Sequence, residues 1–193
     1  MIQFRFTAST HTYVALDTGE ELPHVTGMLT RTGWVDEEWL TEESCDRGTV
    51  VHQLTADYDL GAIENPRSVT SEHKGYLLAH VQAMRLAQLE VLAVEEPIVC
   101  PVWRFGNRPD RVVNDRGMLG PLEIKSGLPA KSHPIQTALQ AIALEHKLKI
   151  PAELQQRLCL YLKPTGKFKL VEHKEQSDFA AAREILAACC GRR

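Results

Sequence analysis

Three ionisable side chains in the middle of the chain have the types and spacing of a hydrolytic site. Asp110 follows a proline, and Glu123 and Lys125 lie two residues apart further along the chain. Because side chains alternate faces along a strand, Glu123 and Lys125 would point to the same face. A turn signal at 114–117 separates the two segments, so pairing of the two strands would place Asp110 opposite Glu123. The sequence therefore predicts two carboxylates and one ammonium at a single site.

The two predicted carboxylates would repel each other unless a cation lay between them. Oxygen ligands with open coordination positions suit Mg²⁺ or Mn²⁺. Lys125 beside that metal would orient an attacking water or help to deprotonate it, and such a site would serve phosphodiester hydrolysis. An alternative for Glu123 and Lys125, taken alone, is a solvated ion pair without a role, because E-x-K on a strand is common.

The segments around these residues alternate between strand and helix patterns, which predicts an α/β fold. The core is expected to be a mixed central sheet flanked by helices, with an N-terminal β-hairpin and a helical segment before it. Apolar patterning and turn residues predict strands at 3–6, 11–16, 94–99, 102–105, 110–113, 122–124, 158–162 and 168–171. They predict a helical turn at 25–29 and helices at 36–58 (capped by Asp36), 71–92, 133–147 and 179–188 (capped by Ser177).

The length of 193 residues suits one domain. We expect a single domain over 1–193, made of an N-terminal preamble (1–35), a helical part (36–92) and an α/β catalytic core (93–193). The formal net charge of −3 argues against a strongly basic nucleic-acid coat. Basic residues nevertheless outnumber acidic ones after residue 120, so one basic face can form.

No segment has the length of apolar sequence that a membrane span needs, and the first residues lack the apolar region of a signal peptide. The five cysteines show no C-x-x-C spacing, and an odd count without a secretion signal predicts reduced thiols in a cytoplasmic setting.

The ordered motifs resemble the PD-(D/E)-x-K nuclease superfamily, in its RecB-like branch. Residues 47–52 (Arg-Gly-Thr-Val-Val-His) look like the R-G-x-x-x-H helix motif of that branch, and Pro109-Asp110 with Glu123-x-Lys125 looks like its catalytic core. His133-Pro134-Ile135-Gln136 looks like the approach to its glutamine-bearing helix. The N-terminal segment also resembles the preamble of phage exonucleases and of the mitochondrial genome maintenance exonuclease. The resemblance implies a restriction-endonuclease-like core.

The resemblance also implies which residues hold the metal. The histidine of the helix motif is a ligand in that branch, so His52 joins Asp110 and Glu123, and the carbonyl of Ile124 completes the set. On its own, His52 would more often be an ordinary histidine on a helix face.

Three further residues receive a role from the resemblance. Gln136 would orient Lys125 or a phosphate, and Arg47 belongs to the same helix motif as the predicted histidine ligand. Glu96 resembles an acidic residue that the branch often places at the start of a strand. The alternative for Glu96 is a solvated glutamate at the strand end.

The chain departs from the branch at two positions. Asn107 stands where a glycine is usual, and because asparagine tolerates a positive φ we expect the turn there to form. Gln140 stands where a tyrosine is frequent, which puts in doubt the tyrosine's role in substrate positioning rather than the metal chemistry.

The resemblance implies a divalent-metal-dependent DNA nuclease, and an exonuclease of phage recombination or replication type before a restriction-type endonuclease. Its partners would be DNA and a single-strand annealing or replication protein. The protein would be encoded by a phage or by its bacterial host and would act in the host cytoplasm. An oligomer is compatible with this function, although nothing in the sequence specifies one. The alternative is a nuclease-like DNA-binding or assembly subunit without catalysis.

Overall fold

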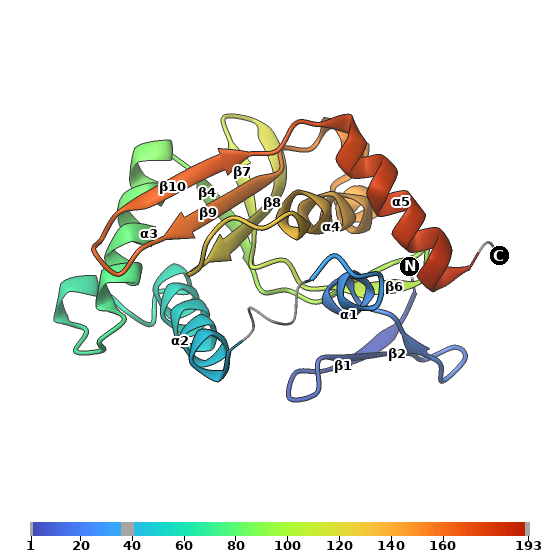
Figure 1. Ribbon diagram of the computed structural model, residues 1–193, viewed down its shortest axis with the longest axis horizontal. Helices are drawn as coiled ribbons and strands as arrows, with labels where there is room; N and C mark the ends of the chain where they lie inside the picture. Colours follow the sequence, from blue (N-terminus) through green and yellow to red (C-terminus); the bar gives the residue numbers. More distant parts are fainter. Residues whose placement is uncertain (1, 36–40, 192–193) are drawn as a thin grey trace.

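The computed structural model describes residues 2–35 and 41–191. Its centre is a five-stranded mixed sheet with helices on both faces (Figure 1). The strand order is β10-β9-β8-β7-β4, and β8 and β9 run parallel while the other neighbours run antiparallel. The strands are β4 (Glu90–Val94), β7 (Arg111–Asp115), β8 (Met118–Lys125), β9 (Leu158–Leu162) and β10 (Phe168–Glu172). The prediction of a mixed sheet flanked by helices is confirmed.

Two smaller sheets and five helices of the described residues surround this centre. The N-terminal sheet is antiparallel, in the order β1-β2-β3, and β5 pairs with β6 in a separate hairpin. These strands are β1 (Phe4–Thr7), β2 (Thr12–Ala15), β3 (Glu21–Leu22), β5 (Ile98–Cys100) and β6 (Phe105–Asn107). The helices are α1 (Val25–Arg31), α2 (Glu42–Asp59), α3 (Lys74–Ala87), α4 (Ser132–Leu148) and α5 (Gln176–Cys190), with 3₁₀ turns at Pro66–Ser68 and Ala152–Leu154.

The central sheet separates two apolar cores, and strand alternation assigns each residue to one of them. Val112 belongs to the core with α1, α4 and α5, whereas its neighbour Val113 packs on the opposite side with α2 and α3. Leu122 and Ile124 also point to the α2–α3 side. Glu123, between them, therefore faces α4.

Several predicted boundaries were wrong for local reasons. The strand expected at 94–99 is two strands in different sheets, β4 and β5. The strand expected at 102–105 is mostly a turn that ends at Arg104, whose φ is +52°, and β6 follows it. The helix expected at 71–92 begins at Lys74 and ends at Ala87, because Gln88 adopts a left-handed conformation.

Neither of the two predicted N-caps, Ser177 and Asp36, is seen to cap a helix in the described residues. Ser177 does not cap the last helix, because α5 starts one residue earlier with Glu175 at its N-cap. Asp36, the predicted cap of the helix 36–58, lies outside the described residues. Within the described part, α2 starts after Thr41, whose hydroxyl accepts a hydrogen bond from the Ser44 amide at 3.2 Å.

None of the helices in residues 2–35 and 41–191 combines the length and the apolar character that crossing a bilayer requires.

Gly106 connects the N-terminal sheet to the rest of the molecule. Its amide donates to the Pro23 carbonyl at 2.7 Å, and it forms a bridge with His24. A Cβ at this position would lie 2.3 Å from the ring of Tyr13, which is fully buried. We predict that Gly106→Ala lowers the free energy of unfolding by about 1–3 kcal/mol through overpacking.

Urea denaturation of the Gly106→Ala variant would test this close approach. Gly127→Ala is the matched control, because a Cβ there meets nothing within 4 Å. Equal stability of the two variants would contradict the packing seen at Tyr13.

Candidate active site

Strand pairing brings Asp110 and Glu123 together at the start of β7 and the end of β8, two inner strands of the central sheet. Arg111 pairs with Leu122, so Asp110 lies opposite Glu123 across β7 and β8. Asp110 Oδ2 accepts a hydrogen bond from the Ile124 amide at 2.7 Å, which fixes the carboxylate against the neighbouring strand. The expectation that these two acids face each other agrees with this register. The role of the Ile124 carbonyl stays a prediction.

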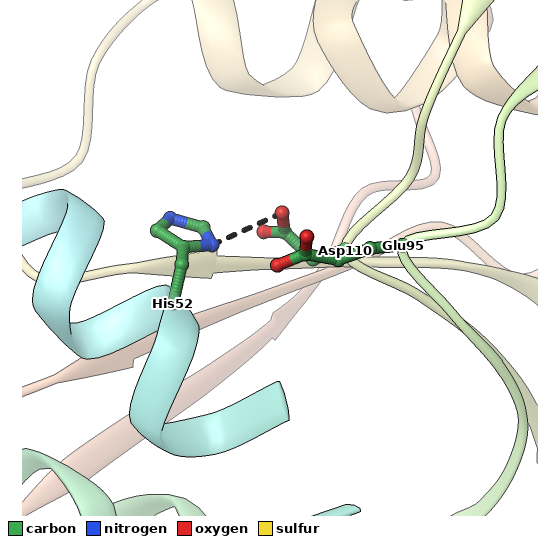
Figure 2. Close-up of side chains that lie close together, drawn as sticks. All are labelled: His52, Glu95 and Asp110. Atoms are coloured by element: carbon green, nitrogen blue, oxygen red, sulfur yellow. Dashed lines mark ion pairs between the residues drawn. The ribbon is translucent and has the colours of Figure 1, made fainter. Parts of the chain in front are cut away.

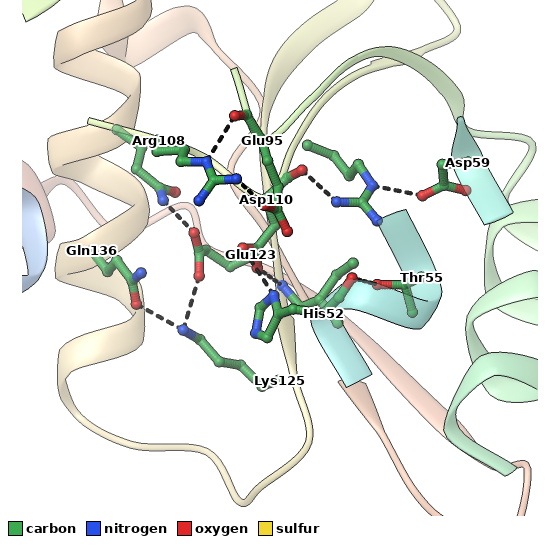
Figure 3. Close-up of polar contacts among 12 residues, drawn as sticks. His52, Thr55, Asp59, Glu95, Arg108, Asp110, Glu123, Lys125 and Gln136 are labelled. Atoms are coloured by element: carbon green, nitrogen blue, oxygen red, sulfur yellow. Dashed lines mark hydrogen bonds and ion pairs between the residues drawn. The ribbon is translucent and has the colours of Figure 1, made fainter. Parts of the chain in front are cut away.

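Glu123 is held by side chains from two elements (Figure 3). Lys125 Nζ donates to Glu123 Oε2 at 2.8 Å and to Gln136 Oε1 at 2.9 Å, and Gln140 Nε2 donates to Glu123 Oε1. The glutamate is 2% exposed. Gln136 and Gln140 lie one turn apart on α4, so one helix face positions both Glu123 and Lys125.

His52 reaches the site from α2. Its Nδ1 lies 3.1 Å from Asp110 Oδ1, and its side chain is 29% exposed. His52, Glu95 and Asp110 each offer a ligand atom, and these atoms all lie within 4.8 Å of one another (Figure 2). One imidazole nitrogen and two carboxylates form a donor set that fits Mn²⁺ and, with water in the open positions, Mg²⁺.

The acidic residue before the β5–β6 hairpin that enters this group is Glu95 rather than the predicted Glu96. Glu96 instead forms an ion pair with Lys147 and is half exposed. The backbone of Glu95 has a φ of +45°, and its side chain pairs with Arg108. Strand patterning cannot distinguish the two glutamates, because a left-handed residue breaks the alternation at this point.

The charges of the site shift one another's proton affinities. Burial raises the pKa of Asp110 by itself, but the neighbouring His52 and Lys125 outweigh burial and lower it to about 2. The charge of Asp110 in turn raises the pKa of His52. Burial and the charge of Asp110 raise the pKa of Glu123. Burial lowers the pKa of Lys125, but Glu123 and Asp110 outweigh burial and raise it, so Lys125 is an ammonium group at neutral pH.

A buried ion cluster holds α2 over the sheet beside this site. Asp59 Oδ2 lies 2.6 Å from Arg111 Nε, and both carboxylate oxygens lie 2.9 Å from His80 Nε2 on α3. The three side chains are at most 5% exposed. His52 and Asp59 are two helical turns apart and so share one face of α2. One helix face therefore contacts two consecutive residues, Asp110 and Arg111.

Two hollows meet at the site. The smaller, about 230 Å³, is lined by His52, Asp110, Glu123, Lys125 and Gln136, together with Gln140, His11, Val25, Thr26, Asn107 and Arg108. The larger, about 860 Å³, shares His52 and Lys125 with it and extends over Arg47, Trp34 and the segment 126–133. The predicted residue Arg47 thus lies beside the acidic group rather than within it.

Sequence reasoning missed several residues of the smaller hollow. Gln140 stands where the resembled family often has a tyrosine, and the sequence assigns it no role in the site. Its spacing of four residues from Gln136 is the signal that could have placed both side chains on one helix face. Asn107 lies in β6 and is not among the positive-φ residues, so the predicted left-handed turn there was wrong. Its pairing with Ile98 explains the extended backbone. His11 comes from the β1–β2 turn, and no local signal in the sequence connects it to residues a hundred positions away.

No protein-family model matches the chain, and no curated protein matches it. Among solved structures, a "putative exonuclease" from Eubacterium rectale is similar over 84% of this chain and 69% of its own, with a TM-score of 0.49 and 10% sequence identity.

Proposed function

We propose that the protein is a divalent-metal-dependent nuclease that hydrolyses phosphodiester bonds in DNA. The observation that carries this proposal is the convergence of Asp110, Glu123 and Lys125 on one hollow with a histidine from a separate helix. The order of the motifs favours an exonuclease of phage recombination or replication type over an endonuclease. Mg²⁺ or Mn²⁺ is the proposed cofactor.

In this proposal, His52, Glu95 and Asp110 hold the metal, and Glu123 and the Ile124 carbonyl complete its surroundings. When bound, the metal would polarise the scissile phosphate and lower the pKa of a water molecule. Asp110 is already oriented for this task by the Ile124 amide. The carboxylate therefore needs little rearrangement before it binds a cation.

In this mechanism Lys125 acts as a positively charged hydrogen-bond donor and not as a general base. Its pKa is raised, so the ammonium group would orient the attacking water and stabilise the negative charge that develops on the phosphate. Gln136 Oε1 accepts a hydrogen bond from this ammonium at 2.9 Å and Glu123 accepts a second, which leaves one N–H group to act on the substrate. Gln140 fixes the carboxylate of Glu123, with which the same ammonium pairs.

Cleavage of labelled linear and closed circular DNA with Mg²⁺, Mn²⁺ or chelator tests the proposal. Wild type should degrade linear DNA only when metal is present, and Asp110→Asn should not. Cleavage of closed circles would indicate an endonuclease instead. Binding of DNA in chelator without cleavage in any metal would support the non-catalytic subunit and overturn the nuclease.

The raised pKa of His52 predicts that metal affinity depends on pH. A metal ligand must be neutral imidazole, so Mn²⁺ has to displace a proton from His52 at any pH below the raised value. We expect Mn²⁺ affinity to fall as the pH decreases through the raised pKa of His52, which lies above the usual value of 6.5.

Isothermal titration calorimetry in buffers of different ionisation enthalpy would measure the released proton. His52→Gln should bind Mn²⁺ about 10–100-fold more weakly and lose most of this proton release. His146→Gln, which changes an exposed histidine in the last turn of α4, is the control. Proton release that is unchanged in His52→Gln would remove the histidine from the metal site.

A further inference from the structure

The residues that line the smaller hollow are of two chemical kinds. Asp110 and Glu123 bring carboxylates, which would hold a cation. Four other lining residues can donate hydrogen bonds and are not among the proposed metal ligands. We call these four the donor wall; they are His11 from the β1–β2 turn, Thr26 from α1, Asn107 at the end of β6, and Arg108, which follows it.

Asn107 is the strongest sign that the donor wall binds a ligand. The residue is 2% exposed, it lines the hollow, and its Nδ2 has no hydrogen-bond partner in the described part of the protein. Leaving a buried donor unsatisfied costs about 1–3 kcal/mol, so such groups usually have a partner. A ligand oxygen in the hollow would supply one.

The neighbouring groups favour a ligand that accepts hydrogen bonds and carries negative charge. Arg108 brings a positive charge to the wall; its guanidinium pairs with Glu95 and lies 5.6 Å above the ring of Phe6. His11 is held in place by aromatic contacts with His24 and Tyr13, at ring distances of 5.1 and 5.8 Å. Both features keep the wall preformed rather than dependent on the ligand.

We propose that the donor wall is a phosphate-binding subsite, so that the N-terminal sheet contributes to substrate recognition. A phosphate of a DNA strand would place its non-bridging oxygens against Asn107, His11 and Arg108, while the carboxylates of Asp110 and Glu123 would hold the metal. This inference rests on the proposed function, which supplies the DNA substrate. It adds that His11 and Asn107 determine the affinity for the substrate. Loss of the His11 side chain, which comes from the N-terminal sheet, would therefore weaken DNA binding.

Fluorescence anisotropy with a labelled single-stranded oligonucleotide in chelator would measure this binding without turnover. Asn107→Leu and His11→Asn should each weaken binding about 10–100-fold, the loss that corresponds to one hydrogen bond to a charged group. His11→Asn keeps a residue that tolerates the observed φ of +52°. His146→Asn is the control. Oligonucleotides that end in a 5′-phosphate, a 3′-phosphate or only hydroxyls distinguish a terminal phosphate from an internal phosphodiester.

A second measurement does not depend on the stability of the variants. Titration of wild-type protein with inorganic phosphate should shift the side-chain amide signals of Asn107 in a ¹⁵N–¹H spectrum, assigned by their loss in Asn107→Leu. Unchanged Asn107 signals, or variants that bind the oligonucleotide as tightly as wild type, would overturn the subsite even if the protein cuts DNA. Weakened binding in both variants without any metal-dependent cleavage by wild type would leave the subsite standing and refute the nuclease.

Discussion

Replacing Lys125 with methionine is expected to reduce DNA cleavage by about 10²–10³-fold, the usual cost of removing one donor that stabilises a transition state. The methionine keeps the apolar stem of the side chain but removes the ammonium that bonds both Glu123 and Gln136. We expect Mn²⁺ binding to persist, because Lys125 repels a cation and its loss leaves the carboxylates in place. The measurement is the initial rate of degradation of end-labelled DNA, combined with calorimetry of Mn²⁺ binding.

Lys163→Met is the matched control, because Lys163 is exposed and follows β9 at a turn. It should retain the wild-type rate. Cleavage by Lys125→Met at more than a tenth of the wild-type rate would exclude a direct role of the ammonium. Loss of both cleavage and Mn²⁺ binding would show that Lys125 supports the fold of the site instead.

Replacing Asp59 with alanine is expected to destabilise the protein by about 3–5 kcal/mol, because it leaves Arg111 as an uncompensated buried charge. Arg111 is fully buried, and its Nη2 already has no partner within the described residues. His80 would lose the same carboxylate. The free energy of unfolding in urea measures the effect. Asp57→Ala is the control, since the side chain of Asp57 bonds only the exposed amide of Gln53 among the contacts described for it.

A double-mutant cycle would separate the ion pair from general packing. Removing both charges in Asp59→Ala with Arg111→Met should recover part of the lost stability, because the buried charge is gone. Additive losses in the double variant would contradict strong coupling between the two residues. We also expect Asp59→Ala to weaken Mn²⁺ binding, because the same helix face carries His52.

Part of the candidate active site was predictable because its information is local. Glu123 and Lys125 share a face through the two-residue period of a strand, and a short turn brings Asp110 back beside them. The mixed α/β architecture likewise follows from apolar patterning that changes period along the chain. The arrangement of Gln136 and Lys125 agrees with the expected role of the glutamine, although its part in catalysis stays a prediction.

The remaining features depend on contacts between distant segments. The choice of Glu95 over Glu96 was decided by a left-handed residue at the end of β4 and by ion pairs with Arg108 and Lys147. No sequence period encodes such pairs, because they join elements whose relative positions are set by packing.

The tertiary structure also decided what surrounds the acidic group. Gly106 allows β6 to approach Tyr13, and this contact brings His11 and Asn107 to the hollow. Local sequence determined the pairing of β7 with β8, since turns and alternation act over a few residues. Contacts between distant segments determined the donor wall of the hollow. The free energy of burial that stabilises these contacts is gained only when the chain folds.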